Sequence, residues 1–337
     1  MVRFNCQTAI FLSKSIYRTR LKRYFCTKKA VQVFNTVDNL DISKPIVTIG
    51  SFDGVHLGHR CMLKQLADYA RKVGGSSVII TLWPHPATVL NPNQHFPLLS
   101  TLDEKIKLLE ETGIDHLIVL PFTKEFSQIE YFDFVADYLV KRLGTDTLFL
   151  GYDNAVGRNG KGHFAELEKL SRQMGFNVLQ LEMLSAKSQP VSSTLIRNLL
   201  SEGKVDEAGI LLDRNYSITG RVVRGNHIGT SMGFPTANVQ PDECKFIPGN
   251  GVYAVKVNVD GKEFLGMLNI GCRPTVSKSD GKTTIEANLF GFNGDLYGKD
   301  ITVAFLKKIR NERQFPSIDS LCEQLKKDCQ FIAGNFK

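Results

Sequence analysis

The sequence predicts a protein of two folded domains, a parallel α/β domain followed by a small antiparallel β-barrel. At 337 residues the chain is longer than a typical single domain. Strand-like and helix-like segments alternate up to about residue 200, which is typical of a parallel sheet covered on both faces. From about residue 215, short strand-like segments are separated by Gly, Pro, Asp and Asn, which indicates a barrel.

In the first domain, apolar residues recur either at helical spacing or in short β-branched runs. The expected strands are 46–49, 77–82, 116–120, 147–150 and 177–181. Helices are expected at 59–73, after a capping box at Thr101 and Glu104, and before Gly144 and Gly175. Ligands of such sheets bind beyond the carboxyl ends of the strands, near the point where the strand order reverses, so we expect the chemistry in those loops.

In the second domain, hairpin signals at Gly261 and Gly294-Asp295 join strand-like segments. The expected strands are 217–223, 251–259, 264–270, 283–290 and 301–305, with one helix from 317 to about 329. The predicted limits are 1–37 for a leader, 45–200 for the α/β domain, 201–214 for a helical connector and 215–337 for the barrel.

The first 37 residues predict a targeting segment. They contain eight Lys and Arg residues and no Asp or Glu, as transit peptides do. The whole chain has 42 basic and 34 acidic side chains, so the remainder carries 34 of each and gives no indication of nucleic-acid binding. Nor is any apolar run long enough to cross a membrane. We expect import into the mitochondrial matrix, with the plastid, or the cytoplasm for a non-functional leader, as alternatives.

The seven cysteines give no sign of a metal site. They form no Cys-x-x-Cys pair, and none has a histidine at zinc-ligand spacing. Reduced thiols are therefore expected, and small molecules are the expected partners.

The residues after the first predicted strand, 50–59, predict a nucleotide site. Glycines let the backbone turn tightly and approach an anion, and the following helix offers free amides to phosphate. His56 and His59 would both donate hydrogen bonds as charge builds on a triphosphate. The alternative is a Gly-rich turn with two incidental histidines, but His-x-Gly-His at a strand-to-helix junction favours the nucleotide site.

A second cluster, 192–197, opens a later helix. Its hydroxyl-bearing residues would cap the helix, and Arg197 lies one turn further along. Alone this is an ordinary cap. As the partner of the first cluster it would be a second grip on an anion, with the Arg197 guanidinium as a fork for phosphate oxygens.

The two clusters resemble the signatures of the bacterial-type bifunctional riboflavin kinase/FMN adenylyltransferase family (FAD synthetase). The second domain carries a further ordered set of motifs that resembles the flavokinase module. This set is Gly220-Arg221-Val222-Val223, Gly229, Gly233-Phe234-Pro235-Thr236-Ala237-Asn238, Asn269-Ile270-Gly271, Pro274-Thr275, Ile285-Glu286, Asp295-Leu296-Tyr297-Gly298, Arg310 and Phe315. The resemblance covers about residues 46–330. Two unrelated sets of motifs that occur in the expected order identify the family more specifically than either set alone.

The resemblance implies an α/β nucleotidyltransferase domain with a Rossmann-like parallel sheet, followed by a six-stranded riboflavin kinase barrel. The barrel would phosphorylate riboflavin to FMN. The α/β domain would join FMN and ATP to give FAD and pyrophosphate. ATP is then a co-substrate, Mg²⁺ the implied cofactor, and riboflavin, FMN and FAD the substrates and products.

The resemblance also implies roles for single residues. Arg197 and the two histidines would neutralise phosphate charge, and Glu286 would accept the proton of the riboflavin 5′-hydroxyl. Thr236 and Asn238 would give Mg²⁺ hard oxygen ligands. The implied sets are catalytic Glu286, His56, His59 and Arg197; ATP-binding Gly50, Asp53, Gly58, Ser193, Thr194, Gly220 and Gly233; flavin-binding Asp153, Asn154, Asn288 and Arg310; and metal-binding Thr236 and Asn238.

Taken singly, these residues also have plain structural interpretations. Thr236 and Asn238 would order a turn after Pro235, and Glu286 would be a solvated strand residue. His85, in a Pro-rich segment after the second strand, is either a pocket residue or part of a rigid loop. The family match favours the functional roles of the first three.

The chain departs from the family pattern in both domains. Asn154 and Val156 stand where aromatics are usual, and Thr230, Asn288 and Gly291 replace common residues of the barrel. Two alternatives to a bifunctional enzyme are therefore considered, namely an enzyme with one active half and a non-catalytic flavin-binding protein. The second is disfavoured because a carrier needs no phosphate chemistry.

Overall fold

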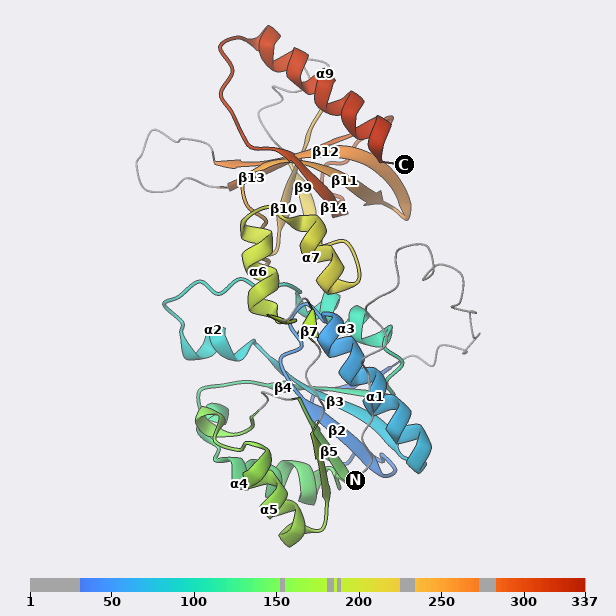
Figure 1. Cartoon of the computed structure of the whole chain (residues 1–337), viewed down its shortest axis with the longest axis vertical. Coiled ribbons are helices and arrows are strands. Elements are labelled where there is room, and N and C mark those ends of the chain that lie inside the picture. The colour runs from blue at the N-terminus through green and yellow to red at the C-terminus, as the bar shows by residue number, and fades with distance from the viewer. Residues whose placement is uncertain are drawn as a thin grey trace. The chain divides into compact units, whose positions relative to one another are not determined.

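The computed structural model describes residues 31–151, 155–180, 185–186, 189–224, 234–272 and 283–336 (Figure 1). The leader up to residue 30 lies outside these ranges, as do the predicted site residues Asp153, Asn154 and Gly233 and the family departure Thr230.

The first domain is built on a parallel sheet, as the sequence predicts, and this sheet has six strands rather than the five expected. Its strands are β1 (Gln32–Phe34), β2 (Pro45–Ile49), β3 (Ser76–Trp83), β4 (His116–Pro121), β5 (Thr147–Leu150) and β6 (Asn177–Gln180). They lie in the order β1-β4-β3-β2-β5-β6, so the strand order reverses between β2 and β5. Every residue of β2 and β5 is buried, as expected for strands covered on both faces. The loop that follows β2 therefore begins at the switch point of the sheet.

β1 is a strand that the sequence does not predict, and it lies within the range 1–37 assigned to a leader. Residues 32–34 pair in parallel with 116–118 of β4, and Val37 is fully buried in the domain core. A three-residue edge strand in a segment without acids gives almost no periodic signal. The fold therefore extends into the predicted leader, and residues 31–37 are part of the α/β domain.

Helices cover both faces of this sheet (Figure 1). α1 (Leu57–Val73) and α3 (Leu102–Glu110) pack on one face through a core that includes Leu63, Leu66 and Leu109. The other face is covered by α4 (Tyr131–Asp133), the π-helical segment η2 (Phe134–Arg142) and α5 (Phe164–Met174). The shorter elements are α2 (Pro86–Leu90), η1 (Phe126–Gln128), η3 (Arg158–Gly160), β7 (Ser185–Ala186) and β8 (Gln189–Pro190).

Local signals fix the ends of these helices. The capping box of Thr101 and Glu104 at the start of α3 is confirmed. Gly74 and Gly175 end α1 and α5 in the left-handed conformation, at φ 67° and 78°. α1 begins two residues earlier than predicted, because His56 rather than a Ser or Thr caps it.

The predicted connector is helical and continues into the core of the barrel. Residues 201–214 contain α7 (Val205–Leu212), and Gly203 at φ 76° separates it from α6 (Ser193–Ser201), which ends the range predicted for the α/β domain. Ile196, Leu200 and Leu212 are fully buried in the same cluster as the barrel interior. The connector is thus part of the second domain's packing.

The second domain is a closed six-stranded antiparallel barrel, as predicted. Its strands are β9 (Ser217–Val223), β10 (Ala237–Pro241), β11 (Gly251–Val259), β12 (Lys262–Cys272), β13 (Thr283–Leu289) and β14 (Asp300–Arg310), in the closed order β10-β13-β12-β11-β14-β9. Of these, β10 was described in the sequence only as a motif, since its flanking prolines and its asparagine are unusual in strands. The helix α9 (Ile318–Asn335) packs outside the barrel against β11 and β12 through Ile332.

Gly220 of β9 has a packing reason to be glycine. A Cβ at this position would lie 2.7 Å from the backbone oxygen of Gln240 on the neighbouring β10. Contacts that short are not tolerated, so the predicted ATP-binding glycine is required first by the approach of two strands.

We expect Gly220→Ala to lower the free energy of unfolding by about 1–3 kcal/mol, because the added methyl group forces β9 and β10 apart. Gly334→Ala is the matched control. Gly334 lies in α9 with open space around its Cβ position, so the same change should be neutral or stabilise by up to about 1 kcal/mol. Urea unfolding of both variants measures this. Equal stability of Gly220→Ala and the unmodified protein would refute the packing explanation.

Candidate active sites

The loop from β2 to α1 holds a strained backbone at the switch point. Phe52 and Val55 have φ values of 47° and 39°, in the left-handed region that non-glycine residues rarely adopt. Both side chains are buried. The Arg214 guanidinium donates to the carbonyl oxygens of Gly54 at 2.6 Å and of Val55 at 3.3 Å, which helps to hold this conformation.

The two predicted histidines stack at the end of this loop. Their ring centroids are 3.6 Å apart and their planes 15° apart. His56 Nδ1 accepts a hydrogen bond from the His59 backbone N–H at 3.3 Å, so its own proton lies on Nε2, a potential donor to ligand. Burial, then the neighbouring His56, then Lys105 lower the pKa of His59 well below its usual value. Within the described ranges, His59 Nδ1 is buried and has no hydrogen-bond partner.

Asp53, which the sequence predicts to bind ATP, forms hydrogen bonds and an ion pair with other residues of the protein. Its carboxylate is buried and accepts hydrogen bonds from the backbone N–H groups of Leu99 and Ser100, both at 3.0 Å. It also forms an ion pair with Arg197, with 2.5 Å between Oδ2 and Nη2. Asp53 therefore organises the loop, the segment 98–100 and α6.

The second predicted cluster lies directly against the first. Ser192 caps α6, and the Ser193 hydroxyl donates to the Asp53 backbone oxygen at 2.9 Å. A Cβ added at Gly58 would lie 3.2 Å from the imidazole of His56, so the glycine leaves room for that ring. Thr194 is exposed at the first turn of α6. Two motifs about 140 residues apart thus form one site, as the sequence predicts; Gly50, at the end of β2, completes the loop.

Arg197 and His85 are joined through an aromatic ring. The guanidinium of Arg197 lies 4.5 Å from the centroid of Phe96, and the His85 ring stacks on the same phenylalanine at 5.0 Å. Burial lowers the pKa of His85 to about 4, although Asp53 acts to raise it, so this imidazole is neutral at pH 7. Sequence reasoning raised His85 as a possible pocket residue but missed Phe96.

The barrel contributes to the framework of the α/β site. The Leu98 N–H donates to the Cys244 carbonyl at 2.6 Å, and the Phe246 N–H donates to the Leu98 carbonyl at 2.7 Å. Between them, the ammonium of Lys245 forms a buried ion pair with Glu104 of α3. The segment that holds Asp53 is therefore bonded to residues 244–246 of the second domain.

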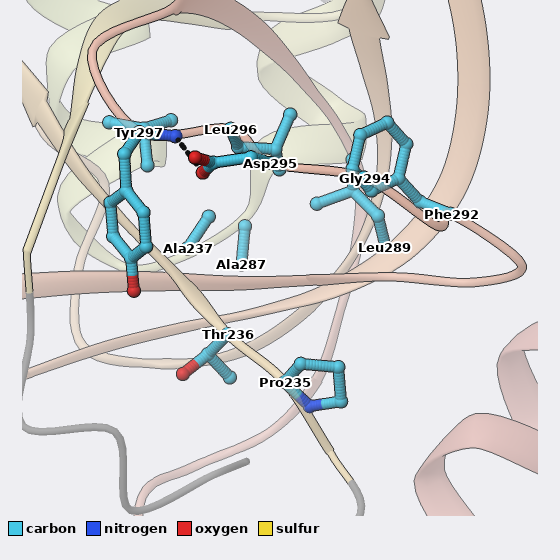
Figure 2. A pocket seen from close by; sticks show the side chains of 11 residues that line it. Pro235, Thr236, Ala237, Ala287, Leu289, Phe292, Gly294, Asp295, Leu296 and Tyr297 are labelled. Carbon is cyan, nitrogen blue, oxygen red and sulfur yellow. Dashed lines mark hydrogen bonds between the residues drawn. The ribbon is translucent and has the colours of Figure 1, made fainter.

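In the barrel, a cavity of about 310 Å³ opens beside the predicted metal-binding motif. Figure 2 shows Pro235 and Thr236 on one side and Asp295, Leu296 and Tyr297 on the other. The Asp295 carboxylate accepts a hydrogen bond from the Tyr297 N–H at 2.9 Å, which orders this second side. Residues 235–237 and 295–297, which belong to two of the motifs that resemble the flavokinase module, thus line one cavity.

The polar residues of β10 and β13 lie side by side on the outer face of the barrel. Asn238 is the register partner of Glu286, which in turn pairs with Asn269 of β12. Their neighbours Ala237 and Ala287 point into the barrel core. Since directly opposite residues have Cβ atoms about 5 Å apart, the predicted metal ligand and the predicted base are adjacent.

Two predicted flavin-binding residues have structural partners. The Asn288 amide donates to the Pro235 carbonyl at 2.7 Å and so orders the chain before β10. The Arg310 guanidinium pairs with the buried Asp328 of α9 at 2.9 Å. Of the residues that depart from the family pattern, Val156 packs in the α/β core and Gly291 forms a turn at φ 71°.

Other candidate features are absent from the parts of the chain that the structure describes. There, no three His, Cys, Asp or Glu residues are grouped to hold a metal ion. Within these ranges, Cys61, Cys244, Cys322 and Cys329 form no disulfide bond. Within the same ranges, the helices are too short or too polar to cross a membrane.

The fold and the two sites define a nucleotidyltransferase-type α/β domain joined to a riboflavin kinase-type barrel. The FAD synthetase family model matches residues 39–195, and the riboflavin kinase family model matches residues 212–336. The chain belongs to the family of bifunctional riboflavin kinase/FMN adenylyltransferases.

Individual relatives agree with this assignment. The bifunctional riboflavin kinase/FMN adenylyltransferase of Buchnera aphidicola (Schizaphis graminum) is 37% identical over 87% of this chain and 95% of that protein. The protein of the same description from Listeria monocytogenes is 36% identical over 86% and 91%. A crystal structure described as a macrolide-efflux protein from Streptococcus pneumoniae is 28% identical and superposes with a TM-score of 0.82, covering 92% of this chain and 100% of that one.

We expect Asp53→Asn to lower the free energy of unfolding by about 3–5 kcal/mol, because it leaves the guanidinium of Arg197 without its buried counter-charge. Asp68→Asn is the control, since Asp68 pairs with Arg71 on the surface with half of its side chain exposed. That change should cost less than about 1 kcal/mol. Denaturant unfolding compares the two variants, and similar losses would contradict a central role for Asp53.

Proposed function

We propose that this chain makes FAD from riboflavin in two ATP-dependent steps, with one step in each domain. The barrel phosphorylates riboflavin to FMN, and the α/β domain transfers the adenylyl group of ATP to FMN. The observation that carries the proposal is the presence of both polar constellations, the histidine pair with α6 and the Asn238–Glu286 row on the outer face of the barrel.

In the barrel, Glu286 is the general base. The 5′-hydroxyl oxygen of riboflavin attacks the γ-phosphorus of ATP, its proton passes to the Glu286 carboxylate, and ADP leaves. The adjacent register of Glu286 and Asn238 would bring the base and the nucleotide phosphates to the same face of the barrel. The proposed kinase site also includes Gly220, Gly233, Asn288 and Arg310. Asn288 contributes by ordering the chain before β10, and Arg310 by its pairing with α9.

The donor set beside this face is compatible with Mg²⁺. The Thr236 hydroxyl and the Asn238 side-chain oxygen are hard ligands, and Thr236 lines the cavity. Mg²⁺ is usually held by one or two protein oxygens together with substrate phosphates. When bound, the ion would neutralise charge on the phosphates, while Thr236 and Asn238 orient them.

In the α/β domain, the reaction needs no covalent intermediate. A phosphate oxygen of FMN attacks the α-phosphorus of ATP, a new P–O bond forms, and pyrophosphate departs with the electrons of the broken bond. His59, kept neutral by burial, and His56 would donate hydrogen bonds to the phosphates. Arg197 would supply positive charge, Ser193, Thr194, Gly50 and Gly58 would surround the nucleotide, and Asp153 and Asn154 would face the flavin.

We expect Glu286→Gln to reduce riboflavin phosphorylation by about 10²–10⁴-fold and to leave the conversion of FMN to FAD intact, because the amide cannot accept the proton. Glu263→Gln, an exposed glutamate of β12, is the matched control. Chromatography of products from riboflavin or FMN with Mg-ATP measures both steps.

His59→Ala should produce the reverse pattern, FMN formation without FAD. Loss of both steps in either folded variant would contradict this division of labour. In the unmodified protein, FMN accumulation would indicate that only the barrel is active, and FAD formed only from supplied FMN would indicate that only the α/β domain is active. Unchanged riboflavin and FMN would indicate a flavin-binding protein.

We also propose that residues 1–30 direct import into the mitochondrial matrix. Fused to a fluorescent protein, they should give a mitochondrial signal, and the chain starting at Val31 should lose it but retain its fold. A chain starting at Asp38 should be less stable, because it lacks β1 and the buried Val37. A plastid or diffuse signal from the fusion would refute the mitochondrial assignment.

A further inference from the structure

Lys105 of α3 is buried without a polar partner. Only 1% of the residue is exposed, which is rare for a lysine unless its charge is paired. Its ammonium lies 5.4 Å from the centroid of the Trp83 ring at the end of β3. Throughout the described ranges, its side chain forms no hydrogen bond or ion pair.

The carboxylates of this region are already neutralised by other cations. Asp53 pairs with Arg197, and Glu104, the chain neighbour of Lys105, pairs with Lys245 of the barrel. The Cys244 thiol carries no charge either, because burial raises its pKa to about 12. Within the described residues, both of these carboxylates are thus paired with other cations, so Lys105 has no counter-charge of its own and its charge is available to a ligand.

The excess charge lies beside the proposed adenylyltransferase site. Lys105 lies over the ring of Trp83, the last residue of β3, and β3 pairs with β2, whose carboxyl end leads into the loop that carries the histidines. Its charge also contributes, after burial, to lowering the pKa of both His59 and His85. Burial lowers the pKa of Lys105 itself to about 8, with Asp53 opposing the shift, so the group remains mainly protonated at pH 7. Burial of a charged ammonium costs desolvation free energy, and an anion that enters the site would offset this cost by binding to it.

We propose that Lys105 is a substrate-binding residue of the α/β site and that its ammonium binds a phosphate oxygen during adenylyl transfer. The inference rests on the proposed function, which brings two such anions, the ATP triphosphate and the FMN phosphate, to this edge of the sheet. Either would provide the hydrogen-bond acceptor and the negative charge that Lys105 lacks within the protein.

Lys105→Met tests the proposal because it keeps the length and apolar stem of the side chain and removes its charge. Lys107→Met, on the exposed side of the same helix, is the matched control. Initial rates of FAD formation are measured with ATP varied at saturating FMN, and with FMN varied at saturating ATP. Riboflavin phosphorylation by the same samples and thermal melting without substrates report on folding.

We expect kcat/KM for the substrate that Lys105 binds to fall about 10–100-fold in Lys105→Met, because one charge-assisted hydrogen bond is lost. A rise in KM for ATP assigns the contact to the triphosphate, and a rise in KM for FMN assigns it to the FMN phosphate. Kinase activity and melting temperature should be maintained or improved, since an unpaired buried charge has been removed.

Two results would overturn the proposal. The first is unchanged kinetics of FAD formation, and the second is a lowered melting temperature with loss of both activities, which would make Lys105 purely structural. Failure of the proposed function is distinguishable, because the unmodified protein would then form no FAD from FMN and ATP.

Discussion

The buried carboxylate of Asp53 is the interaction on which the α/β site depends. It joins the loop after β2, the backbone of residues 98–100 and Arg197 of α6, three segments far apart in the sequence. A neutral side chain could accept the amide hydrogen bonds but would leave the guanidinium unpaired. Since residues 98 and 99 also contact the barrel through Cys244 and Lys245, one carboxylate fixes the frame on which both sequence motifs meet.

This frame also explains how the loop keeps an unfavourable backbone. Left-handed conformations at Phe52 and at the β-branched Val55 cost on the order of 1–3 kcal/mol each. Burial of both side chains and the hydrogen bonds from Arg214 offset that cost. The result is a tight turn that ends at His56, whose imidazole then caps α1 and stacks on His59. The strained turn at residues 52–55 thus places His56 and His59 at the start of α1.

Much of this arrangement follows from sequence, and the exceptions have physical reasons. The sequence predicts five strands of the sheet, the barrel and the meeting of the motifs 50–59 and 192–197. Strands show in the periodicity of a short stretch of sequence, and several motifs in a fixed order reinforce one another. The edge strand β1 is too short to give such a signal. The roles of Asp53 and Lys105 depend on their burial, which the sequence does not state directly. For Lys105 there is one usable indication of burial, since it stands four residues before Leu109 on the apolar side of α3.

Burial also decides which residues carry charge in the α/β site. Because desolvation keeps His59 and His85 neutral at pH 7, the imidazoles contribute hydrogen bonds rather than charge. Compensation of a triphosphate then falls to the guanidinium of Arg197 and to the ammonium of Lys105, whose pKa burial lowers only to about 8. Arg197 is paired with Asp53, whereas Lys105 has no carboxylate partner among the described residues. On electrostatic grounds, the lysine is therefore the cation whose energy changes most when an anion arrives.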